Sequence, residues 1–142
     1  MKKKYYKYLL IFLIFFNFNF TQAEVSYFED GKKLFDDKDY EKSKFMFEKD
    51  IVFNPKNENS YLYLAKIFKE KKNDNLEERY LKTVILLNPK NEEATYLLAL
   101  LNIKRSNFSK SQELIKNFKV ICVEFCSKKK ELQEKLDNSL KK

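Results

Sequence analysis

Apolar residues recur along this chain at helical spacing, in short stretches that polar turns separate. Tyr61, Leu64, Ala65 and Phe68 occupy positions i, i+3, i+4 and i+7, which places their side chains on one face of an α-helix. Isolated helices of about 12 residues are marginal in water, so each needs a neighbour against which to bury its apolar face. The pattern therefore predicts short helices that pack against one another.

Three helical hairpins can be laid out in register from the polar turns. The first runs from about 25 to 53, the second from 58 to 87, and the third begins at 92. Their internal turns lie at 36–39, 73–75 and 106–107, and each contains Asp, Asn or Ser. These side chains accept hydrogen bonds from the free N–H groups that open the next helix.

A pentapeptide occurs twice in the segments that link the hairpins. Asn54-Pro55-Lys56-Asn57-Glu58 recurs 34 residues later as Asn88-Pro89-Lys90-Asn91-Glu92. Each proline disfavours helical geometry at the residue before it, so the preceding helix ends there. Each glutamate places negative charge at the positive end of the next helix. A repeat of this period indicates stacked copies of one small unit.

This unit resembles the tetratricopeptide repeat (TPR), in which small residues let two helices approach closely, large apolar residues fill the spaces and a proline closes the unit. The residues that carry the resemblance are Tyr27, Gly31, Leu34, Tyr40, Ser43, Phe47 and Pro55 in the first repeat, Tyr61, Ala65, Phe68, Leu81 and Pro89 in the second, and Ala99, Phe108, Ser111 and Ile115 in the third. The resemblance implies repeats at 24–57, 58–91 and 92–125 within a region 24–126, then a capping helix and lysine-rich tail at 127–142.

We therefore expect an all-α fold, a superhelical array of about three antiparallel helix pairs with a C-terminal capping helix. The second repeat departs from the pattern, with Asp74 where an aromatic residue is usual and Glu77 where a small one is usual. The third has Val123 in place of proline and Asn102 where an apolar residue is common. A helical bundle without repeats is the structural alternative.

The first 23 residues are typical of an export signal. Lysines at positions 2, 3, 4 and 7 precede an apolar run of eight residues, Leu9–Phe16, and Thr21-Gln22-Ala23 offers a signal-peptidase site. A membrane-spanning helix needs roughly 20 apolar residues, so we expect cleavage after Ala23 and an exported protein in the periplasm or extracytoplasmic envelope. Because Phe18 and Phe20 extend the apolar stretch, an uncleaved membrane anchor is the alternative.

The net charge of +8 lies mostly at the two ends of the chain. The predicted signal holds four lysines and no acid, and residues 127–142 hold six lysines against three acids, which leaves 24–126 close to neutral. A stripe of basic residues that could follow phosphates is missing, so we expect no nucleic-acid partner. Membrane contact after removal of the signal is not expected either, although the lysine-rich tail keeps peripheral attachment as a weaker alternative.

The residue types needed for catalysis are scarce. The chain has no His and one Gly, so the commonest general base and the Gly-rich phosphate loops are missing. The acidic turn at Asp36, Asp37, Asp39 and Glu41 lacks the glycine and the complete oxygen ligand set of a calcium loop. No nucleophile lies beside a base. We expect no enzyme, no cofactor and no metal site.

Cys122 and Cys126 leave two main interpretations open. Two cysteines in an exported protein often form a disulfide, but four residues apart on a regular helix they face each other poorly. Apolar neighbours such as Ile121 and Phe125 favour buried thiols at the end of the last hairpin; a disulfide at a distorted helix end is the other interpretation. Two thiols alone make a poor metal site. Residues 119–126 also fit a strand.

The resemblance to TPR arrays implies a binding surface as well. In that family the first helices of successive repeats line a concave groove that holds a peptide or a partner's helix. By register, the groove residues here are Phe28, Lys32, Phe35, Leu62, Lys66, Lys69, Tyr96, Leu100 and Lys104. Apolar anchors flanked by lysine suit a ligand with hydrophobic side chains and some acid, unless some of these residues pack between repeats instead.

Some TPR proteins clamp a C-terminal carboxylate with Lys and Asn at particular groove positions. Those positions here hold Phe28, Lys32, Tyr63, Glu93 and Leu97. Only one of them is cationic and Glu93 would repel the ligand, so we do not expect carboxylate clamping. The leading hypothesis is an exported TPR adaptor or scaffold that binds a protein or peptide non-covalently. A structural subunit of an envelope complex, or a self-associating repeat protein, is the alternative.

Overall fold

The computed structural model describes residues 26–141, and every regular element in this part of the chain is a helix. The helices are α2 (Tyr27–Asp36), α3 (Tyr40–Phe53), α4 (Glu58–Glu70), α5 (Asp74–Leu87), α6 (Glu92–Lys104), α7 (Phe108–Ile121) and α8 (Lys128–Leu140). None of these seven is long and apolar enough to cross a bilayer. The predicted export signal and its cleavage site lie outside the described residues.

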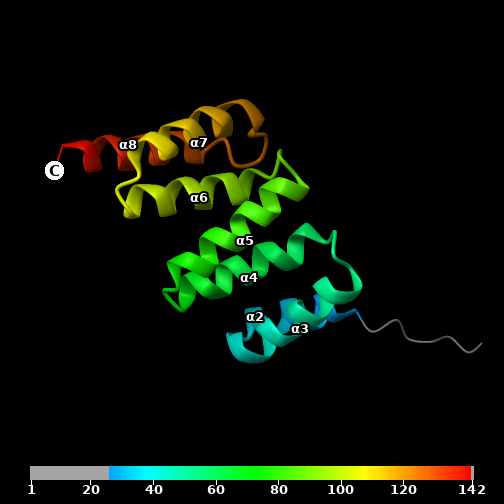
Figure 1. The fold of residues 1–142 in the computed structure, drawn as a ribbon. Coiled ribbons are helices and arrows are strands. Elements are labelled where there is room, and N and C mark those ends of the chain that lie inside the picture. Colours follow the sequence, from blue (N-terminus) through cyan, green and yellow to red (C-terminus); the bar gives the residue numbers. More distant parts are fainter. Residues whose placement is uncertain (1–25, 142) are drawn as a thin grey trace, which may run out of the picture.

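Consecutive helices form antiparallel pairs, and the pairs stack in chain order. The pairs are α2–α3, α4–α5 and α6–α7; α3 packs on α4, α5 packs on α6, and α8 lies against α6 and α7 (Figure 1). This is the superhelical array of helix pairs that the 34-residue period predicted, and the expected fold class is confirmed.

The turn inside each pair uses the same backbone conformation at the same place in the period. Lys38, Lys72 and Ser106 have φ values of 62°, 55° and 59°, which is the left-handed region, and none of them is glycine. The residue that follows each of them opens the next helix. Asp39 and Asn73 accept hydrogen bonds from the N–H groups of Lys42 and Leu76 (3.3 and 3.2 Å). These caps explain why the polar turns could be located from the sequence.

Small residues mark the closest approach of the helices within a pair. The Ser43 hydroxyl donates to the Gly31 carbonyl oxygen at 2.8 Å, and Ser111 donates to the Ala99 carbonyl oxygen at 3.2 Å. A Cβ atom on Gly31 would lie only 2.8 Å from the ring of Phe47. Backbone and side chain therefore meet directly here, as the small residues of the repeat pattern require.

The core consists of two clusters of buried side chains. Phe47, Leu64 and Ile67 form the smaller cluster, between the first two helix pairs. The larger one spans α4 to α8 and includes Leu81, Ile115, Phe118, Leu132 and Leu136. Leu132 and Leu136 bring one side of α8 into this core, whereas Leu140 near the end of α8 is half exposed.

Buried or partly buried carboxylates hold the linkers between the pairs. Asp50 accepts hydrogen bonds from the side chains of Asn54 (3.0 Å), Asn57 (2.7 Å) and Ser60 (2.5 Å). In the α5–α6 linker the acceptor is Glu58, whose carboxylate accepts hydrogen bonds from the side chains of Asn88 and Asn91 at 2.8 and 3.1 Å. Glu92 accepts from the backbone N–H groups of Glu124 and Phe125 at 3.1 and 2.8 Å. Each linker is thus tied to the hairpin that precedes it.

Candidate functional site

The predicted groove residues differ widely in how far they reach solvent. We call the side of the array formed by α2, α4 and α6 the first-helix face. Exposed residues are Lys32, Lys69 and Lys104; partly buried ones are Phe28, Phe35, Lys66 and Leu100; buried ones are Leu62 and Tyr96. Leu62 belongs to the larger core cluster. The partly buried and exposed residues form three local arrangements.

The first arrangement is an aromatic cluster on α2. Phe28 and Phe35 both place a ring edge-to-face against Tyr63, with centroids 5.8 and 5.1 Å apart, and Tyr63 stacks on Phe47 at 4.9 Å. Burial raises the pKa of the Tyr63 hydroxyl, with the nearby carboxylates of Asp36 and Glu93 acting in the same direction. The two phenylalanines are half-buried, so they offer a rigid apolar surface that a partner's side chain could cover.

The second arrangement joins α4 to α6. The Lys66 ammonium lies 2.8 Å from a Glu93 carboxylate oxygen and 4.9 Å from the centroid of the Tyr63 ring. This lysine is therefore engaged with two groups of the protein itself. Its charge is largely compensated before any ligand arrives, which leaves Lys32 and Lys69 as the more available cations of the first-helix face.

The third arrangement is a small cavity of about 110 Å³ between α4, α5 and α6. Its lining residues are Lys69, Glu77, Leu97, Leu100, Leu101 and Lys104. Three of them were predicted as groove residues, and the structure brings them together around Glu77. The side chain of Lys104 lies 2.6 Å from Asp74.

Glu77 was not among the predicted site residues, although its departure from the small residue that is usual at this place in the repeat marked it in the sequence. It occupies the place in the period that Ser43 and Ser111 occupy in the other repeats, and it is only 5% exposed. Burial raises the pKa of the Glu77 carboxyl, and Lys69 opposes part of that shift. The departure from a small residue thus puts an ionisable group in the cavity beside the first-helix face.

Replacement of Glu77 by Gln is expected to make the stability of the protein less sensitive to a rise in pH from acid to neutral. With its pKa raised above the ordinary 4.5, folded Glu77 holds its proton more firmly than the unfolded chain does. The free energy of unfolding therefore falls as pH rises through and above 4.5. Glu77→Gln removes this loss, so its advantage over the parent should grow between acid and neutral pH. Urea unfolding at several pH values measures it.

Glu78→Gln is the matched control, because Glu78 lies next to Glu77 in the chain and its pKa is shifted in the opposite direction. Hydrogen bonding to Lys82 is the main cause that lowers the pKa of the Glu78 carboxyl. The ionised form thus stabilises the fold, and this contribution is lost as pH falls. Glu78→Gln should therefore be at a disadvantage at neutral pH that shrinks in acid. Two variants with the same pH trend would contradict the assignment.

Tyr96 lies beneath the C-terminal helix. Its hydroxyl donates to the Glu131 carboxylate at 3.0 Å, and its ring packs near Phe118 and Phe125. Burial, then the bond to Glu131, raises the pKa of Tyr96 to about 12. Hydrogen bonds from Lys128 and Lys135, with the one from Tyr96, lower the pKa of Glu131 to about 2. Tyr96 therefore secures α8 to α6.

The two cysteines are joined in the structure. Helix α7 ends at Ile121, and Cys122 and Cys126 form a disulfide in the turn before α8, with Cα atoms 5.2 Å apart. Of the two interpretations, the structure thus has the disulfide at a distorted helix end, and not the buried thiols that the apolar neighbours favoured. The disulfide can form because α7 ends before the first cysteine. The strand interpretation of residues 119–126 is wrong, since α7 continues through Ile121 and a turn follows.

The positions at which some TPR proteins clamp a carboxylate do not form an anion site here. Glu93 is paired with Lys66, Tyr63 belongs to the aromatic cluster, and Leu97 is only 8% exposed. Lys32 is exposed but stands without a second cation among these positions. The arrangement therefore offers apolar contact more than carboxylate recognition.

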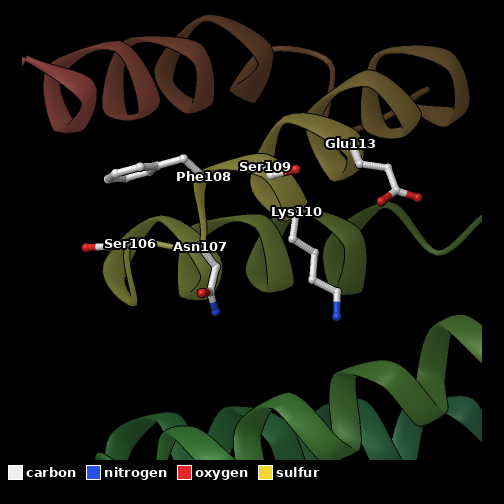
Figure 2. Close-up of a pocket in the computed structure, with 6 residues that line it drawn as sticks. All are labelled: Ser106, Asn107, Phe108, Ser109, Lys110 and Glu113. Carbon is white, nitrogen blue, oxygen red and sulfur yellow. The ribbon is translucent and has the colours of Figure 1, made fainter.

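A separate hollow lies at the turn between α6 and α7. Its lining residues are Ser106, Asn107, Phe108, Ser109, Lys110 and Glu113. Figure 2 shows that the side chains of Phe108 and Glu113 point in opposite directions, with Lys110 directed away from both. Because these groups do not converge on a common point, we assign no ligand to this hollow.

The helix pairs, their capped turns and the face built from their first helices define a TPR-type array. No protein-family profile matches the chain, and no curated protein does. Solved structures do. The first TPR of Spaghetti (RPAP3), bound to the HSP90 peptide SRMEEVD, is similar with a TM-score of 0.73 and 15% identity, over 86% of this chain and 96% of that one.

Two further solved structures are similar over most of both chains. The type III secretion translocator chaperone SycD of Yersinia enterocolitica has a TM-score of 0.72 and 9% identity, over 80% of this chain and 81% of its own. The Sgt2 TPR domain of Aspergillus fumigatus has a TM-score of 0.69 and 12% identity, over 86% of this chain and 84% of its own. At these identities the likeness establishes the TPR fold and nothing narrower.

Proposed function

We propose that this protein is an exported, non-enzymatic adaptor that binds another protein or a peptide through its first-helix face. The observation that carries the proposal is the aromatic cluster of α2. There the half-buried rings of Phe28 and Phe35 pack against Tyr63, which in turn stacks on Phe47. Aromatic side chains held rigid by neighbours are effective anchors for a partner, because little conformational freedom is lost on binding.

The charges of the first-helix face narrow the chemistry of the ligand. The carboxylates of Asp36 and Glu93 lie near Tyr63 in the aromatic cluster, whereas the exposed lysines of this face stand elsewhere on it. Within residues 26–141, neither Lys32 nor Lys69 forms a salt bridge. A ligand with apolar side chains for the cluster and an acidic group for these lysines would complement the face. A C-terminal carboxylate as the main recognition element fits poorly, because Glu93 and Leu97 occupy positions that a clamp needs.

The similar structures support a protein partner in general. The first TPR of Spaghetti holds a peptide, and SycD is a chaperone of translocator proteins. Export rests on the sequence of residues 1–23, whose lysines, apolar run and Thr21-Gln22-Ala23 suit a cleaved signal. We therefore place the protein in the periplasm or the extracytoplasmic envelope, with a protein or peptide as its ligand.

Cross-linking of a tagged copy in its native envelope fraction tests this function. We expect one dominant partner, and Phe35→Glu should reduce its recovery by about tenfold or more, because a charge would be forced against an apolar anchor. Lys69→Glu should reduce recovery less. Tyr96→Glu is unsuitable as a probe of binding, since Tyr96 is buried under α8 and its loss would disturb the fold.

Phe45→Glu provides the matched control, because Phe45 is 52% exposed and lies on α3, outside the first-helix face. Each variant should first show a thermal unfolding transition, which separates lost binding from lost folding. Recovery of the protein only with itself, or in a complex that Phe35→Glu leaves intact, would overturn the adaptor proposal in favour of a structural subunit.

A further inference from the structure

The cavity between α4, α5 and α6 lies where the array lacks a pair of aromatic rings that the preceding interface has. Between α2 and α4, the ring of Phe35 meets that of Tyr63 with centroids 5.1 Å apart. One period later the equivalent positions hold Lys69 and Leu97, and both line the cavity of about 110 Å³. A cavity of this size has room for a side chain of several non-hydrogen atoms.

The Glu77 carboxylate faces this cavity without a partner. Glu77 is 5% exposed, and among residues 26–141 neither a hydrogen bond nor a salt bridge engages its carboxylate. No fully buried side-chain oxygen in this part of the chain lacks a hydrogen bond, so the Glu77 oxygens keep some accessible surface, which the cavity provides. Burial raises the pKa of the Glu77 carboxyl, because its ionised form has lost water without gaining a donor.

The equivalent residues of the other repeats show that pairing of the helices does not require this carboxylate. Ser43 and Ser111 each donate a hydrogen bond to a backbone carbonyl in the first helix of their own pair. An ionised carboxylate has no proton to donate and cannot form that bond. A buried acceptor without a donor is destabilising, so a molecule that brings a donor to Glu77 gains a favourable contact.

The charges around the cavity favour a neutral occupant. Lys69 and Lys104 line the cavity beside Glu77, and Lys104 is paired with Asp74 at 2.6 Å. The two lysines and the two acids cancel. A further cation would meet two ammonium groups, and a further anion would meet the buried carboxylate.

A side-chain amide matches the groups that line the cavity. Its NH₂ group donates to the Glu77 carboxylate, and its carbonyl oxygen accepts from the Lys69 ammonium, which forms no salt bridge within the described chain. Its methylene groups suit the apolar wall, which consists of Leu97, Leu100 and Leu101. A hydroxyl group is too short to use both polar groups and the wall together.

We propose that this cavity is a subsite for one Asn or Gln side chain of the peptide or protein that binds the first-helix face. The inference rests on the proposed adaptor function and makes its ligand more specific. Lys69, Leu100 and Lys104 belong to that face and also line the cavity, so a ligand that lies along the face passes over the cavity. Because an ammonium has three donors, Lys69 can bond the amide and still meet an acidic group of the ligand.

Three small compounds of similar size test the cavity without any partner. Propionamide, propionate and propylamine present a neutral amide, an anion and a cation. NMR of the full chain with labelled leucine methyl groups follows their titration. We expect propionamide to bind most tightly and to shift the signals of Leu97, Leu100 and Leu101 until they saturate. The signal of Leu86, which is 81% exposed and outside the cavity, should stay in place.

Variants at two neighbouring positions show whether Glu77 holds the amide. Glu77→Leu should weaken the binding of propionamide by about tenfold or more, as expected for a lost hydrogen bond to a charged group. Glu77→Gln should retain most of the binding, because its carbonyl oxygen still accepts. Glu78→Leu is the matched control, because Glu78 is paired with Lys82 and Arg105 and does not line the cavity. A thermal unfolding transition confirms that each variant is folded.

Selection of displayed random peptides on the immobilised full chain then relates the cavity to the ligand. On the parent and on Glu78→Leu, we expect Asn or Gln to be enriched at a constant distance from an apolar anchor. On Glu77→Leu, the apolar anchor should persist and the enrichment of Asn or Gln should disappear. Phe35→Glu should remove the apolar anchor instead.

The results that would overturn the subsite differ from those that would overturn the adaptor. Tighter binding of propylamine or propionate would assign the cavity to a charged group, and no saturable shift with any compound would leave it a water-filled space. Selected peptides with an apolar anchor but no preference for Asn or Gln would remove the subsite and keep the adaptor. Propionamide binding together with a cross-linked complex that Phe35→Glu leaves intact would remove the adaptor, and with it the role of the cavity in ligand binding.

Discussion

Phe47→Ala is expected to lower the free energy of unfolding by about 3–5 kcal/mol, the usual cost of removing a buried phenylalanine. Phe47 is fully buried, stacks on Tyr63 and fills the space above Gly31. The smaller core cluster holds only two other fully buried side chains, Leu64 and Ile67, so little can collapse into the gap. Thermal and urea unfolding of the purified variant measure the loss.

Phe45→Ala removes the same atoms from the same helix at a site that is 52% exposed, and it should cost less than about 1 kcal/mol. A similar loss in both variants would mean that the first helix pair does not pack as described. Phe47→Ala should also weaken partner binding, because Phe28 and Phe35 lose the ring arrangement that supports them. In the envelope cross-linking experiment it should therefore behave as Phe35→Glu does.

Asp50→Ala is expected to cost about 2–4 kcal/mol, since hydrogen bonds to a charged group contribute more than neutral ones and the buried hydroxyl of Ser60 would lose its acceptor. Asp50 is 2% exposed and accepts from Asn54, Asn57 and Ser60. These donors lie in the α3–α4 linker and the first turn of α4, so the change should loosen the first pair relative to the second. Amide hydrogen exchange in α2 and α3 should rise first.

Glu48→Ala, two positions earlier on α3, is the comparison for this effect. Glu48 is partly exposed and pairs with Lys44 at 2.9 Å, a surface ion pair that contributes about 0–1 kcal/mol. If Asp50→Ala were no more destabilising than Glu48→Ala, the hydrogen bonds of the linker would not be what holds the first two pairs together.

The sequence was sufficient for the architecture because its strongest signals are local. Pro55 and Pro89 end helices by backbone sterics, and Asp39 and Asn73 begin them by capping N–H groups, so the number and order of the helices follow from short segments. The 34-residue spacing of Gly31, Ala65 and Ala99 then fixes which faces meet. These effects need no knowledge of distant residues.

The site was less predictable because its details depend on contacts between distant segments. Tyr96 was placed in the groove by register, but Glu131, 35 residues further on, bonds to its hydroxyl under α8. Nothing in the sequence near Tyr96 indicates that cover. The pairing of the two cysteines stayed open for a related reason, since its geometry depends on α7 ending at Ile121 rather than several residues later.

The carboxylate ties of the linkers have a consequence for how the protein is made. Glu58 reaches Asn88 and Asn91 at separations of 30 and 33 residues, and Glu92 reaches Phe125 at 33. Each tie can therefore close as soon as its own hairpin has been delivered, without waiting for the rest of the chain. Each helix pair and the linker behind it therefore form a unit that closes on its own, so the array can form unit by unit from its N-terminus as the chain is synthesised.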